Sequence, residues 1–146
     1  MPNPSNKQLV RRYYEEIVST GKVDNIADFV SEDYVEVHDN TRHPIGIDGA
    51  RAHVLGVRET YPDLRLTVNR QISEGEWVVT LGTMRGTHLG EWQGIPPTGK
   101  MIEVTFVNVD RVVDDRIVEH GGAANLLGPL LEIGAVKIAG RTDGNP

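Results

Sequence analysis

The sequence predicts an α+β fold, with amphipathic helices first and a long antiparallel sheet after them. In the first third of the 146-residue chain, apolar residues recur every three or four positions, which is the period of a helix. From Leu64 to Ala123 the chain alternates apolar and polar residues between turn signals, which is the pattern of strands. Strands with one strongly apolar face need a cover, which the helices can supply. We therefore expect a single domain over residues 1–146, with a core at about 5–138 and a polar tail at 139–146.

Two helices and a strand are expected before residue 40. Ser5 and Gln8 have the spacing of a capping box. Helical spacing of apolar residues continues from there to Gly21, a residue type that commonly ends helices. A shorter amphipathic helix is expected over Lys22–Val30. Asp33–His38 alternates apolar and polar residues, which predicts a short strand.

A loop and a third helix are expected next. Asp39–Gly46 contains Pro44, which favours an extended approach to it, and is expected to be a loop. Asp48 is a candidate N-cap for the third helix. Pro62 is expected to end that helix, because proline cannot continue the hydrogen-bond ladder.

Four strands are expected after the helices, at Leu64–Ile72, Trp77–Leu89, Met101–Val113 and Arg116–Ala123. Glu74-Gly75 and Asp114-Asp115 are tight-turn signals between the outer pairs. A Gly- and Pro-rich connection over Gly90–Gly99 links the middle pair, so an antiparallel meander is expected. A short helix over Leu126–Ile133 is expected to close the domain.

Composition excludes several classes of function. Fifteen Lys and Arg against twenty-one Asp and Glu give a net charge of −6, without the basic patch of a nucleic-acid-binding protein. The chain has no cysteine, which excludes disulfides, thiolate nucleophiles and cysteine-zinc sites. The first eight residues are polar, unlike a secretory signal. We therefore expect a cytoplasmic protein with no nucleic-acid and no membrane partner.

Four motifs follow one another in the second half of the chain. They are Gly-Thr-His-Leu-Gly-Glu at 86–91, Gly-Ile-Pro-Pro-Thr-Gly-Lys at 94–100, Arg-Ile-Val-Glu-His at 116–120 and Leu-Leu-Glu-Ile-Gly at 130–134. In this order they resemble the SnoaL-like polyketide cyclase family of the NTF2-like superfamily, and the resemblance runs from about Leu9 to Val136. It implies a cone: a curved antiparallel sheet wrapped by three N-terminal helices, with a short C-terminal helix, around an apolar pocket.

The resemblance also implies a function and exposes a departure from the family. It implies a small-molecule enzyme that uses acid/base chemistry, without cofactor or metal, on a hydrophobic carbonyl or polyketide-like substrate. The family's cyclases carry an acid/base Asp five residues after the His of a Glu-His-Trp motif. Counting from His120 leads to Asn125, and Gly121 stands in place of the Trp. An amide can bind an oxyanion, but it does not transfer protons at neutral pH.

Two alternatives therefore stay open, and so does the question whether the chain is an enzyme. One is a non-catalytic binder of a small hydrophobic ligand. The other is an epoxide hydrolase or isomerase that uses a different carboxylate in the pocket. A pocket-facing carboxylate or histidine favours an enzyme, whereas an interior with only amides and apolar groups favours the binder.

Asn125, His38 and Arg111 are the candidate catalytic residues. Asn125 is the position that the family resemblance indicates, although Asn is also a favoured helix cap. His38 is a candidate base beside Asp39, and its alternative is a histidine at a loop edge. Arg111 can bind an anionic or phenolic oxygen, and its alternative is a solvated charge near a turn.

Six further side chains are the candidate ligand-binding residues: Tyr14, His88, Val104, Phe106, Asp110 and Glu119. Val104, Phe106 and Asp110 share one face of their predicted strand. Glu119 and His120 alternate, so at most one of them faces inward. Periodicity does not decide between them, and counting by family favours the side of Glu119.

The remaining expectations concern metals and self-association. The histidines are scattered without the spacing of a metal site, so no metal is expected. A homodimer is expected from the family. Val107 and Val109 lie on the other face of their strand and suit an isologous sheet contact.

Overall fold

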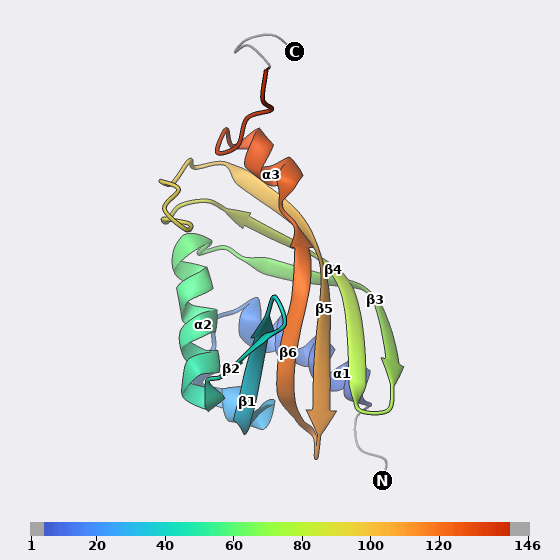
Figure 1. Ribbon diagram of the computed structural model, residues 1–146. Helices are drawn as coiled ribbons and strands as arrows, with labels where there is room; N and C mark the ends of the chain where they lie inside the picture. Colours follow the sequence, from blue (N-terminus) through green and yellow to red (C-terminus); the bar gives the residue numbers. More distant parts are fainter. Residues whose placement is uncertain (1–4, 141–146) are drawn as a thin grey trace.

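The computed structural model describes residues 5–140 and shows helices packed on one side of a bent six-stranded sheet (Figure 1). The helices are α1 (Asn6–Arg12), η1 (Tyr13–Val18), η2 (Val23–Asp28), α2 (Gly46–Thr60) and α3 (Leu127–Glu132). The strands are β1 (Val30–His38), β2 (Thr41–Pro44), β3 (Arg65–Glu74), β4 (Trp77–Thr87), β5 (Met101–Val113) and β6 (Arg116–Asn125). The α+β class is confirmed. Residues 141–146 of the predicted tail lie outside the described residues.

The first helix begins at the predicted capping box and ends in a wider turn. The Ser5 hydroxyl accepts from the Gln8 N–H at 3.2 Å, and the Gln8 side chain accepts from the Ser5 N–H at 3.1 Å. The chain then passes from α1 into η1, a π-helical segment. Such segments recur at functional sites. Here the segment buries the consecutive residues Tyr13 and Tyr14 together.

The segment after β1 was expected to be a loop, and that prediction is wrong. Thr41–Pro44 forms β2, which pairs antiparallel with β1. The hairpin turns through Asp39 and Asn40, both with positive φ, at 50° and 64°. Asp and Asn tolerate this conformation better than other non-glycine residues, which allows the tight turn. The N-cap prediction for α2 is also wrong, because the helix begins at Gly46 and Asp48 lies in its first turn.

The meander of β3, β4, β5 and β6 is confirmed, and β1 adds a pairing that the sequence did not reveal. The strand order is β2-β1-β6-β5-β4-β3. All neighbouring pairs are antiparallel except β1 and β6, which are parallel. A parallel pair needs a long crossover, and here α2 and the first three strands of the meander lie between the two strands in the chain. The first and last long strands therefore meet in the middle of the sheet.

A glycine and a bulge accompany the bend of the outer strands. The register between β3 and β4 shifts between Val68 and Arg70. Opposite the shift, a Cβ atom at Gly82 would lie 2.3 Å from the Phe106 ring and 2.6 Å from the Thr67 carbonyl oxygen. Glycine therefore lets the Phe106 ring lie directly against the backbone of β4.

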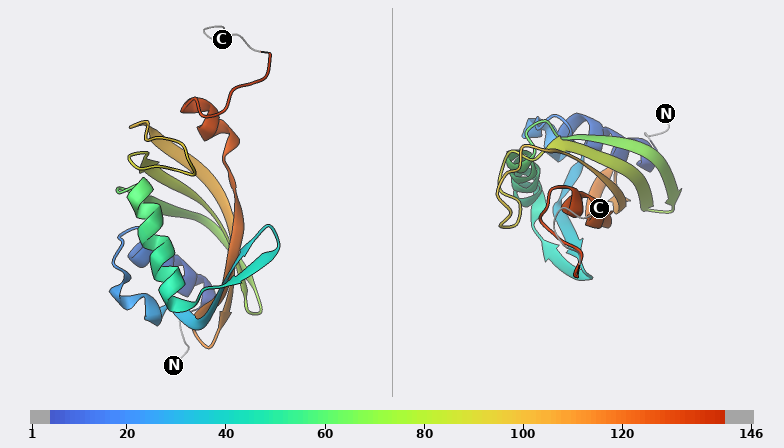
Figure 2. Two further views of the ribbon diagram at one scale, coloured as in Figure 1. Left: turned by 60° about the vertical axis from the view of Figure 1, so that its left-hand side comes forward. Right: turned by 90° about the horizontal axis from the view of Figure 1, so that it is seen from above.

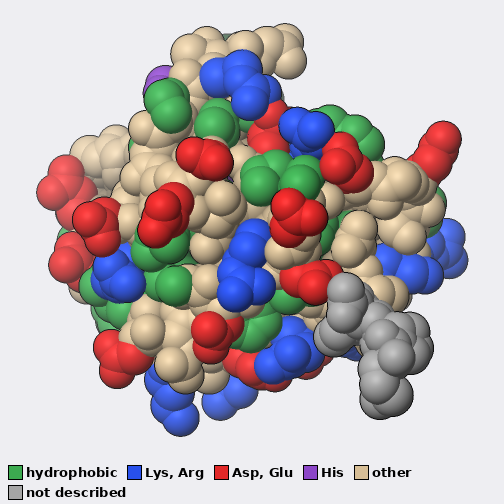
Figure 3. Space-filling model, turned by 90° about the horizontal axis from the view of Figure 1, so that it is seen from below, with side chains coloured by type: hydrophobic (Ala, Val, Ile, Leu, Met, Phe, Trp, Pro, Cys, Tyr) green, Lys and Arg blue, Asp and Glu red, His purple; other side chains and the backbone are tan. Residues whose placement is uncertain are grey.

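The helices cover the inner face of the sheet (Figure 2). Two clusters of buried apolar side chains fill the space between them. Four polar residues are nevertheless buried: Glu36, Thr80, His88 and Asp110. A buried polar group needs a hydrogen-bond partner, so these positions indicate where the core contains polar contacts. Within residues 5–140, no helix is long and apolar enough to span a membrane. On the face shown in Figure 3, basic and acidic side chains are interspersed.

Candidate active site

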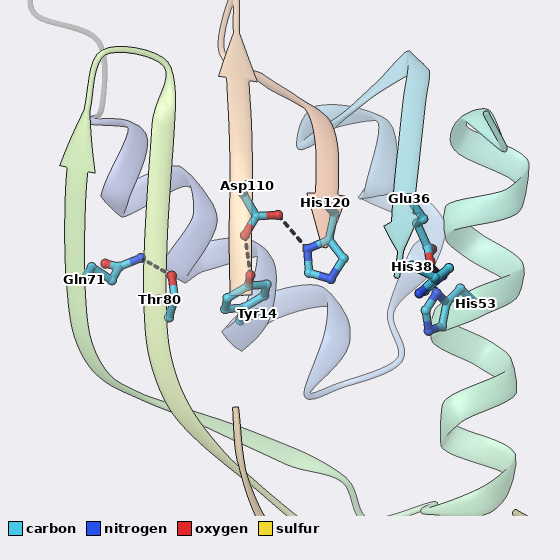
Figure 4. A network of polar contacts seen from close by, with 8 residues as sticks. All are labelled: Tyr14, Glu36, His38, His53, Gln71, Thr80, Asp110 and His120. Carbon is cyan, nitrogen blue, oxygen red and sulfur yellow. Dashed lines mark hydrogen bonds and ion pairs between the residues drawn. The ribbon is translucent and has the colours of Figure 1, made fainter. Parts of the chain in front are cut away.

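Three titratable side chains lie at one level across the inner face of the sheet. His120 on β6 is in register with Glu36 on β1 and with Asp110 on β5. Because neighbouring residues in register project to the same face, the three side chains lie side by side. Figure 4 shows the His120 ring between the other two, with Tyr14 approaching from the helical side.

Asp110 is completely buried and both of its oxygens are occupied. The Tyr14 hydroxyl donates to Oδ2, and Nδ1 of His120 lies 2.6 Å from Oδ1. Tyr14 comes from η1, 96 residues earlier in the chain. A buried carboxylate is tolerated when it is paired and hydrogen-bonded in this way. Asp110 therefore fixes the positions of both Tyr14 and His120.

The His120 imidazole has the features of a proton acceptor. Burial disfavours its charged form, but the charges of Asp110 and Glu36 and the Asp110 hydrogen bond outweigh this, so the pKa of His120 is raised. An ionised carboxylate can only accept, so Nδ1 carries the proton toward Asp110. The other nitrogen, Nε2, is then a free acceptor when the ring is neutral. This is the arrangement of a base oriented by a carboxylate.

The tyrosines beside it stay neutral. Burial raises the pKa of Tyr14 far above its usual value, and the charge of Asp110 raises it further. Burial also raises the pKa of Tyr13 and of Tyr34, and the charges of Asp110 and Glu36 contribute to both. The phenols are consequently neutral hydrogen-bond donors at neutral pH.

Glu36 is a second buried carboxylate and is held by two histidines. Nδ1 of His53, on α2, lies 2.5 Å from Oε1, and Nε2 of His38 lies 3.1 Å from Oε2. Burial acts to raise the pKa of Glu36, but the His53 hydrogen bond and the charges of His53, His120 and His38 lower it overall. Glu36 is therefore ionised at neutral pH.

A cavity of about 90 Å³ lies between η1, α2 and the sheet. Its wall includes Tyr14, Glu36, His53 and His120. The other lining residues are Tyr13, Val18, Tyr34, Ala50, Val54, Val57, Leu66 and Asn108. Among the described residues that line it there is no Lys or Arg. An engineered cavity of ~150 Å³ holds benzene, so a multi-ring ligand requires this cavity to widen.

The structure brings some of the sequence-predicted residues to this cavity. Tyr14 lines it and binds Asp110. The Phe106 ring packs edge-on against Tyr14, with centroids 6.2 Å apart. His38 reaches the cavity wall only through Glu36, and its own side chain is 59% exposed. Their roles in catalysis or binding stay predictions.

Other predicted residues lie away from the cavity. Asn125 is exposed at the end of β6 and lines a shallow depression with Thr105 and Ala123. Arg111 is bonded to Glu76 at 2.9 Å. Glu119 is bonded to Arg42 across the sheet. The strand alternation that turns Asp110 and His120 inward turns their neighbours Arg111 and Glu119 outward.

Val104 and His88 belong to the other end of the core. Val104 is buried in a second cluster with Tyr61 and Leu64. His88 is fully buried, and its Nδ1 lies 3.0 Å from the Thr98 hydroxyl. Its Nε2 and the Tyr61 hydroxyl have no hydrogen-bond partner among the described residues. The rings of His88, Tyr61 and Trp92 pack together with centroids about 6 Å apart.

Glu36, His53 and His120 are not among the residues predicted from the sequence. A usable signal for His120 was present, because Asp110 shares the apolar face of its strand with Phe106 and so needs a polar partner on the next strand. His53 gave none, since a helical histidine shows no partner without the tertiary structure. Within residues 5–140, no group of three His, Asp or Glu side chains is arranged to hold a metal ion.

The comparisons with known proteins agree with this architecture. Residues 8–133 match the family model described as SnoaL-like polyketide cyclase. Nogalonic acid methyl ester cyclase of Streptomyces nogalater is 29% identical over 119 residues, which are 80% of this chain and 88% of that protein. Aklanonic acid methyl ester cyclase DnrD of Streptomyces peucetius is 27% identical over 129 residues, covering 86% of this chain and 88% of that protein.

Solved structures show the same fold. IdmH from Streptomyces antibioticus superposes with a TM-score of 0.76 and 27% identity, covering 90% of this chain and 99% of that chain. TsrD from Streptomyces laurentii gives a TM-score of 0.80 at 23% identity, covering 93% of this chain and all of that chain. The NTF2-like fold expected from the sequence is thereby confirmed.

Proposed function

Since the chain belongs to the SnoaL-like polyketide cyclase family, we propose that it closes a ring in a polyketide-like carbonyl compound by an intramolecular aldol reaction. The observation that carries the proposal is the buried Asp110–His120 pair, which lies at 2.6 Å behind the cavity wall. It supplies a proton acceptor that the sequence-predicted Asn125 cannot supply.

The proposed reaction uses one residue as base. Nε2 of His120 takes a proton from a carbon between two carbonyl groups, and the resulting enolate carbon attacks a ketone carbon of the same molecule. A C–C bond forms, the C=O π bond opens, and the new alkoxide is then protonated. Substrate and product are isomers, so no co-reactant is needed. The charge of Asp110 stabilises the imidazolium that forms, as a carboxylate does in other oriented-histidine sites.

The surroundings suit this chemistry. The lining is mostly apolar and aromatic, so electrostatic interactions inside the cavity are weakly screened. Tyr14 remains a neutral phenol whose hydroxyl is committed to Asp110. It therefore positions the carboxylate rather than transferring protons itself.

The names of the relatives suggest where to test the activity. Methyl esters of aromatic polyketide acids are the substrates to assay first, beginning with aklanonic and nogalonic acid methyl esters. Liquid chromatography with mass spectrometry will detect a product of unchanged mass and altered retention. His120→Gln is expected to lower kcat by about 10²–10⁴, the usual contribution of a general acid/base group.

Two control variants separate this site from the one that the sequence favoured. Arg111→Gln changes the chain neighbour of Asp110 on the outer face and is expected to leave kcat unchanged. Asn125→Ala is expected to do the same, because Asn125 lies away from the cavity. Loss of activity in Asn125→Ala together with full activity in His120→Gln would contradict the proposed site.

Two alternative functions remain predictions. A non-catalytic binder would show saturable binding of these esters with no isomeric product. An epoxide hydrolase or isomerase would use one of the buried carboxylates, Asp110 or Glu36, and is tested by offering small cyclic epoxides to the same protein. The aldol proposal is preferred because the histidine beside Asp110 offers an oriented base.

We also propose that the outer face of the sheet forms a homodimer. Side chains of β3, β4 and β5 there are large, apolar and substantially exposed: Ile72, Trp77, Leu81, Val107 and Val109. Exposed apolar patches of this kind mark interaction surfaces. Light scattering is expected to give a dimer mass for the wild-type protein and a monomer mass for Val107→Lys.

A further inference from the structure

We infer that His53, oriented by the buried Glu36, is a second acid/base residue that donates a proton to the ligand from the helical side of the cavity. The inference deepens the proposed function and rests on it. His120 and Asp110 stand on strands of the sheet, whereas His53 projects from α2 (Figure 4).

The same arrangement of a histidine bonded to a buried carboxylate occurs twice around the cavity. Nδ1 of His120 is bonded to Asp110 at 2.6 Å, and Nδ1 of His53 is bonded to Glu36 at 2.5 Å. In both pairs the carboxylate is buried and the histidine lines the cavity. In both, the carboxylate fixes Nδ1 and leaves Nε2 for a ligand. A purely structural ion pair has no need to repeat this geometry at the same cavity.

Two histidines hold the Glu36 carboxylate in place. Its side chain is only 3% exposed, so it needs compensation for burial. His53 bonds one oxygen and His38 bonds the other, at 3.1 Å. His38 therefore acts as a positioning residue for Glu36, and the carboxylate is locked in the orientation that faces His53.

Two acid/base groups suit the proposed reaction better than one. A single base must carry the proton from the carbon to the alkoxide oxygen after the ring has closed. With two groups, His120 accepts the carbon proton, and a protonated His53 donates its Nε2 proton to the alkoxide as it forms. His120 then carries the extra proton and His53 is neutral. Both are restored through solvent, because their side chains are 22% and 45% exposed.

The division of roles predicts that two activities separate. Deuterium exchange at the activated carbon of the methyl ester requires only the base, whereas ring closure requires both groups. His53→Gln is expected to keep the exchange rate and to lose ring closure by about 10²-fold. His120→Gln is expected to lose both.

His43→Gln is the matched control. His43 is an exposed histidine on β2 whose ring packs beside His38, and it is absent from the cavity wall. It is expected to leave exchange and closure unchanged. Equal loss of exchange and closure in His53→Gln, or no loss of either, overturns the inference while the proposed function stands. Neither activity in the wild-type protein sinks the proposed function instead.

A second measurement needs no substrate. In protein labelled with ¹⁵N at histidine, neutral His53 is expected to show the tautomer with its proton on Nδ1, because that atom is bonded to Glu36. Glu36→Gln removes the charge that selects this tautomer, and the His53 nitrogen shifts are expected to move while those of His43 stay. A neutral His53 that carries its proton on Nε2 instead of Nδ1 in the wild-type protein overturns the inference.

Discussion

An acidic and a basic residue lie in register on each face of the sheet. On the inner face they bond to each other, and on the outer face they bond to other partners. On the inner face Asp110 is in register with His120, and on the outer face the next residues, Arg111 and Glu119, are in register with each other. The inner pair bond directly, and Asp110 is 0% exposed. The outer pair turn to other partners, and Arg111 is 42% exposed in its bond with Glu76. Both pairs consist of an acidic and a basic residue, so what separates them is the burial of Asp110 and its direct bond with His120.

Exposed and buried pairs also differ in how much they contribute to the free energy of unfolding. An exposed ion pair contributes about 0–1 kcal/mol, because water and salt screen it and its side chains lose rotational freedom. Removing one member of a buried pair costs about 3–5 kcal/mol, since the other is left buried without a partner. Variants on the two faces therefore test whether the contrast holds in solution.

The largest effect on stability is expected for Asp110→Ala. The change leaves the buried Tyr14 hydroxyl and the Nδ1 of His120 without their acceptor, and the free energy of unfolding is expected to fall by about 3–5 kcal/mol. Urea unfolding followed by circular dichroism measures it. Asp110→Asn, which keeps the shape, is expected to lose less. A loss of less than about 1 kcal/mol for Asp110→Ala would show that the buried pair contributes no more to stability than an exposed ion pair.

A smaller effect, dependent on pH, is expected from the titration of the inner face. The pKa of His120 is raised above 6.5, so its contribution to stability is full below pH 6.5 and is lost as pH rises through the folded value. The pKa of Glu36 is lowered below 4.5, so its contribution is present above pH 4.5 and is lost as pH falls through the folded value. Both contributions are complete between these limits.

The measurement is urea unfolding of the wild-type protein and His120→Gln between pH 6 and pH 9. The stability difference between the two proteins is expected to shrink as pH rises. A difference that grows toward alkaline pH would show that the pKa of His120 is lowered by burial instead of raised by its carboxylate neighbours.

The smallest effect is expected on the outer face. Arg111→Ala breaks the bond to Glu76 and is expected to change the free energy of unfolding by at most about 1 kcal/mol. Added salt at 0.5 M is expected to reduce that difference further, because it screens exposed charges. A loss of unfolding free energy as large as that of Asp110→Ala would show that the outer pair contributes as much to stability as the inner pair.

Local sequence patterns predicted most of the helices and strands. Features that depend on the pairing of distant segments were not predicted. The capping box at Ser5 and the span of Met101–Val113 follow from neighbouring residues, and both are confirmed. The parallel contact of β1 with β6 joins segments far apart in the chain, and no local period reveals it. The dependence on distant pairing also explains why the site was predicted only in part. Tyr14 and Asp110 were selected as candidate residues, but the facing of His120 depends on that pairing.

The meeting of the first and last long strands also has a consequence for how the protein is made. Tyr14 and Asp110 are separated by 96 residues, which a ribosome needs about 5–20 s to add. Until β6 emerges, β1 has no parallel partner and the early helices have an incomplete surface to cover. Sheets built on such distant pairings fold in milliseconds to seconds, more slowly than helical bundles. The nascent chain therefore lacks His120, the residue that β6 contributes to the cavity wall, until the last strand emerges.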